Sequence, residues 1–157
     1  MKKRTRLLKK VEGIYFMTKG KSIGEVKVGD SAHISKTITE EDIELFARAT
    51  GDFNPVHLDE AYAQKTMFKG RIAHGLLSVG LFSTILGNTL PGHGTIYLSQ
   101  EIKFLAPVRI GDTITATVEV LELIPEKNRS KLRTSCVNQD GKLLADGTAW
   151  VMPPRKG

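Results

Sequence analysis

Residues 75–86, GLLSVGLFSTIL, constrain the fold more than any other segment of the chain. The helix that they predict has apolar side chains on every side, since seven large apolar residues are interrupted only by two serines and one threonine. A helix that is apolar all round is a buried helix. Gly87, Asn88, Pro91 and Gly92 then end it. The rest of the chain must therefore supply a surface that covers this helix.

The residues that follow the helix have the pattern of such a surface. From Thr95 onward, apolar residues alternate with polar or smaller ones, which is the period of strands with one buried face. The residues Gln139, Asp140 and Gly141 separate two of these runs and indicate a hairpin. The sequence predicts strands at residues 25–28, 31–38, 96–104, 114–120, 131–137 and 142–152. The expected class is α+β, with an N-terminal strand pair, a buried helix and several long antiparallel strands.

Two shorter helices are expected between the N-terminal strands and the buried helix. Thr39 has the position of an N-cap, with Asp42 three residues later to complete a capping box. Ile38 is placed to contact Ile43 across that cap. A second short helix is expected over residues 59–65, with an aspartate as its N-cap.

Between these two helices lies the motif G-D-F-N-P-V-H, residues 51–57. Asp52 and His57 have unperturbed pKa values of about 3.9 and about 6.5, so together they can accept and return the proton of one water molecule. Pro55 fixes its own φ and restricts Asn54, which limits the freedom of this turn. In the alternative interpretation, these residues only form a turn and His57 is a surface histidine. The motif taken by itself leaves both interpretations open.

The charge of the chain is concentrated at its N-terminus. The 157 residues carry a net charge of +6, but six of the 23 basic residues lie within residues 1–10. The remainder has 17 basic residues, equal to the 17 acidic ones. We therefore expect residues 1–17 to be a disordered basic extension and residues 18–157 to be a single domain. Binding of an anionic partner by the extension, and a translation start at Met17, are the alternatives.

Several classes of protein are not expected. No apolar run reaches the roughly 20 residues that cross a bilayer, and no secretory signal follows the basic residues, so we expect no membrane partner. The single Cys136 fits a reducing compartment, and we expect a cytoplasmic protein. The four histidines are scattered without Cys-His spacing, so no metal site is expected. The neutral domain also predicts no nucleic-acid partner.

Four motifs in chain order resemble the MaoC-like (R)-specific enoyl-CoA hydratases, also called hydratase 2 enzymes. They are G-D-F-N-P-V-H-L-D (51–59), R-I-A-H-G-L-L-S (71–78), L-P-G-H-G-T-I-Y-L-S-Q (90–100) and F-L-A-P-V-R-I-G-D (104–112). The resemblance runs from about Thr18 to the C-terminus. It implies the hot dog fold, in which a long antiparallel sheet wraps around a central helix.

The resemblance also implies an activity and a set of site residues. The activity is that of a hydro-lyase, the reversible hydration of trans-2-enoyl-CoA to (R)-3-hydroxyacyl-CoA, without a metal or redox cofactor. By position, Asp52 and His57 would activate the water, and Asn54 would help to orient the water or the thioester. The backbone N–H of Gly75 would receive the thioester carbonyl. Helix physics agrees, because an amide at a helix N-terminus is unpaired and lies at the positive end of the helix dipole.

Other positions have weaker assignments. Ser83 and Leu86 match positions that line the acyl pocket in the family, although both are also ordinary core positions. His74 is expected to be a structural lead into the helix rather than a second base. Lys103 and Arg109 are basic residues that the sequence does not distinguish from any exposed cation, so neither is assigned to coenzyme A.

Two alternative functions share the same fold. One is a (R)-3-hydroxyacyl-[acyl carrier protein] dehydratase, for which a basic docking face would be expected. The other is a non-catalytic module that binds acyl thioesters, which would not need the acid/base pair. The resemblance further implies a homodimer or higher homo-oligomer that binds its acyl-CoA substrate at the subunit interface.

Overall fold

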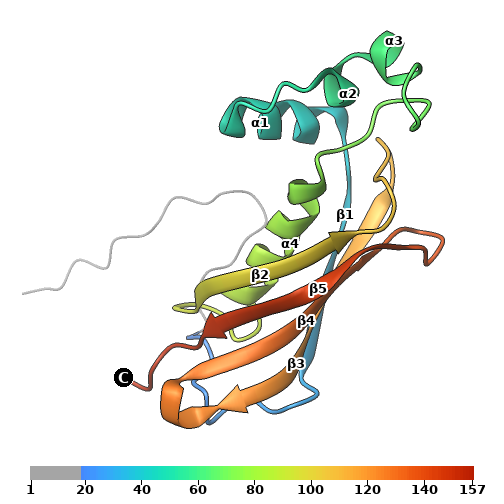
Figure 1. The fold of residues 1–157 in the computed structure, drawn as a ribbon. Helices are drawn as coiled ribbons and strands as arrows, with labels where there is room; N and C mark the ends of the chain where they lie inside the picture. The colour runs from blue at the N-terminus through green and yellow to red at the C-terminus, as the bar shows by residue number, and fades with distance from the viewer. Residues whose placement is uncertain (1–18) are drawn as a thin grey trace, which may run out of the picture.

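The computed structural model describes residues 19–157, so the predicted basic extension and its boundary lie outside the described residues. Five strands form one antiparallel sheet in the order β1-β3-β4-β5-β2. Figure 1 shows helix α4 (Gly75–Asn88) lying along one face of this sheet. This is the hot dog fold, and the predicted α+β class is confirmed. The strands are β1 (Ser31–Thr37), β2 (Ile96–Phe104), β3 (Thr113–Ile124), β4 (Arg129–Val137) and β5 (Leu143–Met152).

The core lies between α4 and the concave face of the sheet. Alternate residues of the central strands are fully buried, as the period of two predicts. Register shifts interrupt the pairing of β3 with β4 and of β2 with β5, and such irregularities increase strand twist, which helps the sheet to curve around the helix. The core side chains include Ile114, Ala116, Val118 and Leu132 from the sheet and Leu81, Phe82, Ile85 and Leu86 from α4.

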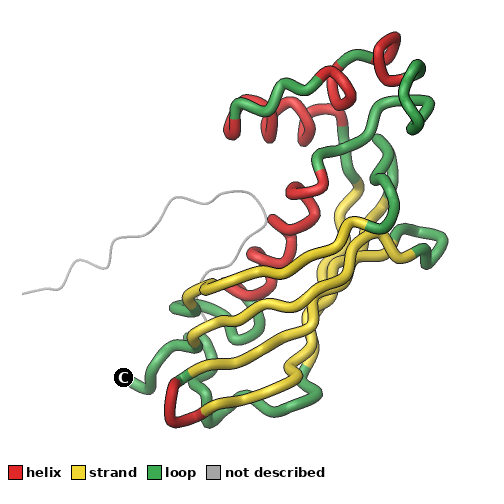
Figure 2. Tube along the Cα trace, in the orientation of Figure 1, coloured by secondary structure: helices red, strands yellow, loops and turns green. Residues whose placement is uncertain are grey.

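Three short helices lie together at the end of the sheet where α4 begins (Figure 2): α1 (Glu40–Thr50), α2 (Pro55–Leu58) and α3 (Glu60–Ala63). The predicted capping box of α1 is confirmed. The Asp42 N–H donates to Thr39 Oγ1 over 3.2 Å, and the Thr39 N–H donates to Asp42 Oδ2 over 2.9 Å. Gly51 is the C-cap of α1, and its φ of 80° is the left-handed conformation that glycine adopts without strain.

One sequence prediction in this half of the chain is wrong. Residues 25–28 form turns rather than a strand, so β1 has no partner strand within residues 19–30 and pairs with β3. The physical reason is local, because the Glu25 carboxylate accepts hydrogen bonds from the Ser22 N–H (2.8 Å) and hydroxyl (2.7 Å) and closes a tight turn. The second short helix is confirmed, with Asp59 as its N-cap, and it ends at Ala63, two residues before the expected end. A 3-10 turn, η1 (Pro125–Lys127), connects β3 to β4.

The prediction that α4 is buried on all sides holds for only part of its surface. Ser78, Leu81, Phe82, Ile85 and Leu86 are buried. On another face Leu76 is 59% exposed, and Ser83 and Thr84 are exposed as well. Residues 19–157 therefore leave one face of this apolar helix uncovered. Within residues 19–157 the structure contains no helix with the length and apolar character needed to cross a membrane.

Candidate active site

The loop between α1 and α2 positions Asp52 and His57. The Asn54 N–H donates to Asp52 Oδ1 over 3.2 Å, and Asn54 Oδ1 accepts from the Val56 N–H over 3.2 Å, capping α2. Pro55 occupies the first turn of α2, where its missing N–H costs nothing. The turn that the sequence indicated is therefore present, and it carries both titratable residues. Because the Asn54 side chain caps a helix, its role toward water or thioester stays a prediction.

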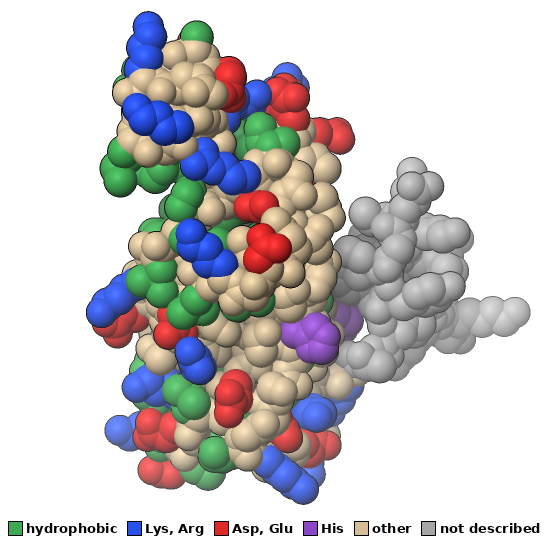
Figure 3. All heavy atoms as spheres, turned by 90° about the vertical axis from the view of Figure 1, so that its right-hand side faces the viewer, with side chains coloured by type: hydrophobic (Ala, Val, Ile, Leu, Met, Phe, Trp, Pro, Cys, Tyr) green, Lys and Arg blue, Asp and Glu red, His purple; other side chains and the backbone are tan. Residues whose placement is uncertain are grey.

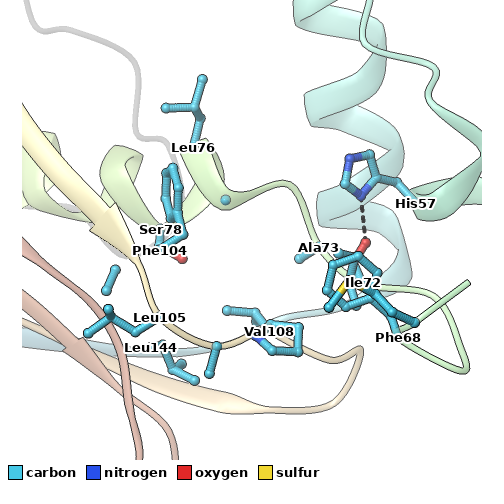
Figure 4. Close-up of a pocket in the computed structure, with 15 residues that line it drawn as sticks. His57, Phe68, Ile72, Ala73, Leu76, Ser78, Phe104, Leu105, Val108 and Leu144 are labelled. Carbon is cyan, nitrogen blue, oxygen red and sulfur yellow. Dashed lines mark hydrogen bonds between the residues drawn. The ribbon is translucent and has the colours of Figure 1, made fainter.

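His57 is buried, and its ring has a defined orientation. Its Nδ1 lies 2.8 Å from the carbonyl oxygen of Ile72, as the dashed line in Figure 4 shows. Since a carbonyl only accepts, Nδ1 carries the proton and Nε2 of the neutral ring is left as an acceptor. Burial lowers the pKa of His57 from its ordinary value, against the raising effects of the Ile72 carbonyl and the Asp52 carboxylate. This neutral imidazole can accept a hydrogen bond from water.

His74 joins the pair, which the sequence did not predict. Its Nε2 lies 3.0 Å from the backbone carbonyl oxygen of Asp52 and 4.0 Å from Asp52 Oδ2. Its ring centroid is 3.9 Å from that of His57 and 4.6 Å from that of Phe46. The sequence signal that pointed here was the H-G pair just before α4, but it was assigned only a structural role. The structure thus brings Asp52, His57 and His74 into one cluster.

In the described part of the chain, the same three residues are the group that could hold a metal ion. One ligand atom from each lies within 4.8 Å of the others. Zinc bonds of about 2.0–2.2 Å in a tetrahedral site would place ligand atoms about 3.4 Å apart, whereas Asp52 Oδ2 is 4.0 Å from His74 Nε2. That nitrogen also already faces the Asp52 carbonyl. The expected absence of a metal stays a prediction.

Gly75 begins α4 and lies on the same cavity as His57. Its N–H donates to no acceptor among residues 19–157, as expected for the first residue of a helix. The cavity has a volume of about 480 Å³, and Figure 4 shows the side chains around it. Its walls are mainly apolar, with Phe68, Ile72, Phe104, Leu105, Val108 and Leu144 among the lining residues. Gly75, whose amide is unpaired, and the neutral His57 therefore both line one apolar cavity.

The structure does not bring the two predicted acyl-pocket residues to this cavity. Ser83 is exposed on α4, and Leu86 is 1% exposed within the core. Neither lines the cavity, where the α4 hydroxyl is that of Ser78. The predicted substrate contacts of Ser83 and Leu86 stay predictions.

Of the two unassigned basic residues, Arg109 has a structural role. Its guanidinium donates to the carbonyl oxygens of Gly70 (3.1 Å) and Phe68 (2.5 Å), and so holds the segment that forms one wall of the cavity. Lys103 is exposed on β2.

The fold and the site define a MaoC-like domain. The family model described as "MaoC like domain" matches residues 25–141, and the chain belongs to this family. The protein is similar to the "(R)-specific enoyl-CoA hydratase" of Rhodospirillum rubrum, with 54% identity over 85% of this chain and 92% of that protein. It is 47% identical to the "3-hydroxybutyryl-CoA dehydratase" of Methylorubrum extorquens, over 84% of this chain and 83% of that one. The solved structure of "R-Hydratase PhaJ1 from Pseudomonas aeruginosa in the unliganded form" superposes with a TM-score of 0.82 and 47% identity, over 87% of this chain and 88% of that chain.

Proposed function

We propose that this protein is an (R)-specific enoyl-CoA hydratase, a hydro-lyase that adds water reversibly to trans-2-enoyl-CoA. The observation that carries the proposal is the pairing of two groups on one apolar cavity, the neutral His57 ring and the unpaired Gly75 N–H. The names of the relatives supply the class of substrate. A site of this kind can polarise a thioester and activate water beside it.

Hydration forms a bond between the water oxygen and C3 of the enoyl thioester. The electrons of the C2–C3 double bond move toward the carbonyl, so negative charge develops on the thioester oxygen. The Gly75 N–H, at the positive end of the α4 dipole, is the donor for that charge. Such a donor typically lowers the activation free energy by about 2.7–4 kcal/mol.

Proton transfer completes the reaction. Asp52 is the principal base for the water proton, and His57 Nε2 holds the water and assists the return of a proton to C2. A positioned acid or base typically contributes about 10² to 10⁴ in rate.

The apolar walls of the cavity suit the other half of the substrate. An acyl group that enters a cavity lined by Phe68, Phe104 and Leu144 buries apolar surface, which favours binding. Exclusion of water also strengthens the interaction of the Gly75 amide with the developing charge. No metal or redox cofactor takes part in these steps, and we propose that the enzyme needs none.

We further propose that the enzyme is a homodimer. Strand β2 is an edge strand of the sheet in residues 19–157, and its Ile96 (50% exposed), Leu98 (42%) and Phe104 (51%) are unusually exposed for large apolar residues. The uncovered face of α4 adds Leu76. An exposed apolar edge strand is a template for pairing with another chain. A second copy would extend the sheet through β2 and cover this face of α4 beside the cavity.

The function is tested by hydration of crotonyl-CoA, followed as loss of the enoyl-thioester absorbance. We expect turnover by the parent protein and a fall of about 10² to 10⁴ in kcat for Asp52→Asn. Asp140→Asn, in the exposed β4–β5 turn, makes the same chemical change away from the site and should keep the parent rate. No turnover by the parent, or full turnover by Asp52→Asn, would refute the proposal.

A second arm of the assay separates the two thioester carriers. Crotonyl-[acyl carrier protein] is offered in place of crotonyl-CoA, and we expect the coenzyme A thioester to have the higher kcat/KM. On the face shown in Figure 3, cationic and anionic side chains are interspersed, and that face shows no extended basic surface for an acidic carrier protein.

We also propose a cytoplasmic location, which fractionation of cells with an antibody to the protein would test.

A further inference from the structure

We propose that His74 is a positioning residue, which holds Asp52 in line with His57 by donating a hydrogen bond from its ring to the backbone carbonyl of Asp52. The inference rests on the proposed hydratase function. It gives a functional role to a residue for which the sequence predicted only a structural role before α4. His74 is not placed in contact with the substrate.

The first observation is that the His74 ring is fixed on several sides. The residue is 3% exposed, and the rings of Phe46 and His57 lie against it. Its Nε2 lies 3.0 Å from the Asp52 carbonyl oxygen. A carbonyl only accepts, so Nε2 carries the proton and His74 is a donor to the loop that holds the proposed base.

The second observation is the other nitrogen of the same ring. His74 Nδ1 is buried and has no hydrogen-bond partner among residues 19–157. A buried polar atom without a partner typically costs about 1–3 kcal/mol. If this position served packing alone, an apolar ring of similar size would fill it without that cost. The histidine is explained by its other nitrogen, which holds the Asp52 loop.

The third observation is that His74 belongs to a short segment that contacts every part of the site. Arg71 Nε donates to the carbonyl oxygen of His57 over 2.8 Å, and the Ile72 carbonyl accepts from His57 Nδ1. His74 then holds Asp52, and Gly75 offers its free N–H. The side chains and backbone of residues 71–75 thus align the base, the imidazole and the oxyanion donor. An error of about 1 Å in such an arrangement can cost about 100-fold in rate.

Two substitutions separate a positioning role from a packing role. His74→Phe keeps a ring between Phe46 and His57 but removes the donor. His74→Gln loses the ring but retains an amide donor at a similar distance from the main chain. Positioning predicts that kcat falls by about 10- to 100-fold in His74→Phe with KM changed less than threefold, and that His74→Gln recovers most of that loss. Packing predicts the opposite order, with phenylalanine better tolerated than glutamine. His33→Phe, on the exposed side of β1, is the control and should leave kcat unchanged.

A readout that does not depend on turnover keeps this inference separate from the proposed function. Amide hydrogen exchange of residues 51–54 should be faster in His74→Phe than in the parent, and near the parent rate in His74→Gln. If the parent does not hydrate crotonyl-CoA, the proposed function fails, and the exchange rates still decide the positioning role. Parent-like exchange and kcat in His74→Phe, or equal losses in both variants, would overturn the inference. Should His74→Phe not fold, His74→Leu replaces it with the same expected result.

Discussion

The role of the Gly75 amide can be isolated with two substitutions at one position. Gly75→Pro removes the N–H, while Gly75→Ala keeps it and adds the same Cβ. Proline is well accepted at the first position of a helix, where the N–H has no partner in the helix. The residue before a proline must be extended, and His74 already has φ −60° and ψ 130°. The backbone can therefore accept proline at this position.

The two variants share one steric cost. A Cβ at position 75 would lie 2.8 Å from Phe104 Cε1 and 3.0 Å from Cδ1. The atoms that this Cβ would meet belong to the Phe104 ring, the far end of a side chain that can rotate, and not to the backbone. Both variants require this movement, so it does not contribute to the difference between their kcat values. That difference reports the replacement of the N–H by the proline Cδ. Loss of one oxyanion donor predicts that kcat of Gly75→Pro is lower than that of Gly75→Ala by about 10²- to 10³-fold, or about 2.7–4 kcal/mol.

The assay is steady-state hydration of crotonyl-CoA, with circular dichroism to show that both variants are folded. We expect Gly75→Ala to retain measurable turnover and Gly75→Pro to have a much lower kcat. If two folded variants differed in kcat by less than threefold, the amide would not stabilise the developing charge, and the reasoning from its free N–H would be refuted.

Four further predictions concern stability, pH, metal and assembly. Thr39→Ala removes the α1 capping box and should lower the free energy of unfolding by about 1 kcal/mol in urea titrations; an unchanged midpoint would contradict the cap's role. Because burial lowers the pKa of His57, the unfolded chain binds a proton that the folded protein does not, so stability should fall as pH decreases through about 6.5 and become level below the folded pKa. His57→Gln should show a weaker dependence, and an equal one would argue against the assignment. Dialysis against EDTA should leave kcat unchanged, whereas activity that is lost and then restored by zinc would show a metal enzyme. Light scattering should give the mass of a dimer for the parent and a smaller mass for Leu98→Arg on the β2 edge; a monomeric, fully active parent would contradict the proposed dimer.

The sequence predicted those elements whose determinants are local. The α1 cap depends on residues three apart, and the strands after Thr95 depend on an alternation that any half-buried strand must have. Residues 25–28 misled the same reasoning. Val26 is buried there without any strand pairing, because Glu25 folds back onto Ser22. A turn closed by side-chain hydrogen bonds leaves no periodic pattern to recognise.

The part of the site that depends on residues close together in the chain could also be predicted. Asp52 and His57 belong to one stiff motif, which allowed the two side chains to converge but equally allowed a simple turn, and the structure brings them together. The position of His74 depends on a contact between residues 22 apart in the chain and on the packing of three rings, which no local pattern encodes. The uncovered face of α4 is a third case, because an apolar residue such as Leu76 looks the same in a sequence whether its own chain or a neighbour covers it.

The stereochemistry of the product tests the proposed arrangement of the site. With Gly75 on the carbonyl and Asp52 and His57 at the water, the site should add water to a single face of the substrate. Hydration of crotonyl-CoA followed by chiral chromatography of the product should give (R)-3-hydroxybutyryl-CoA with almost none of the (S) form. An (S) product, a racemic mixture, or no product from the folded protein would contradict the account.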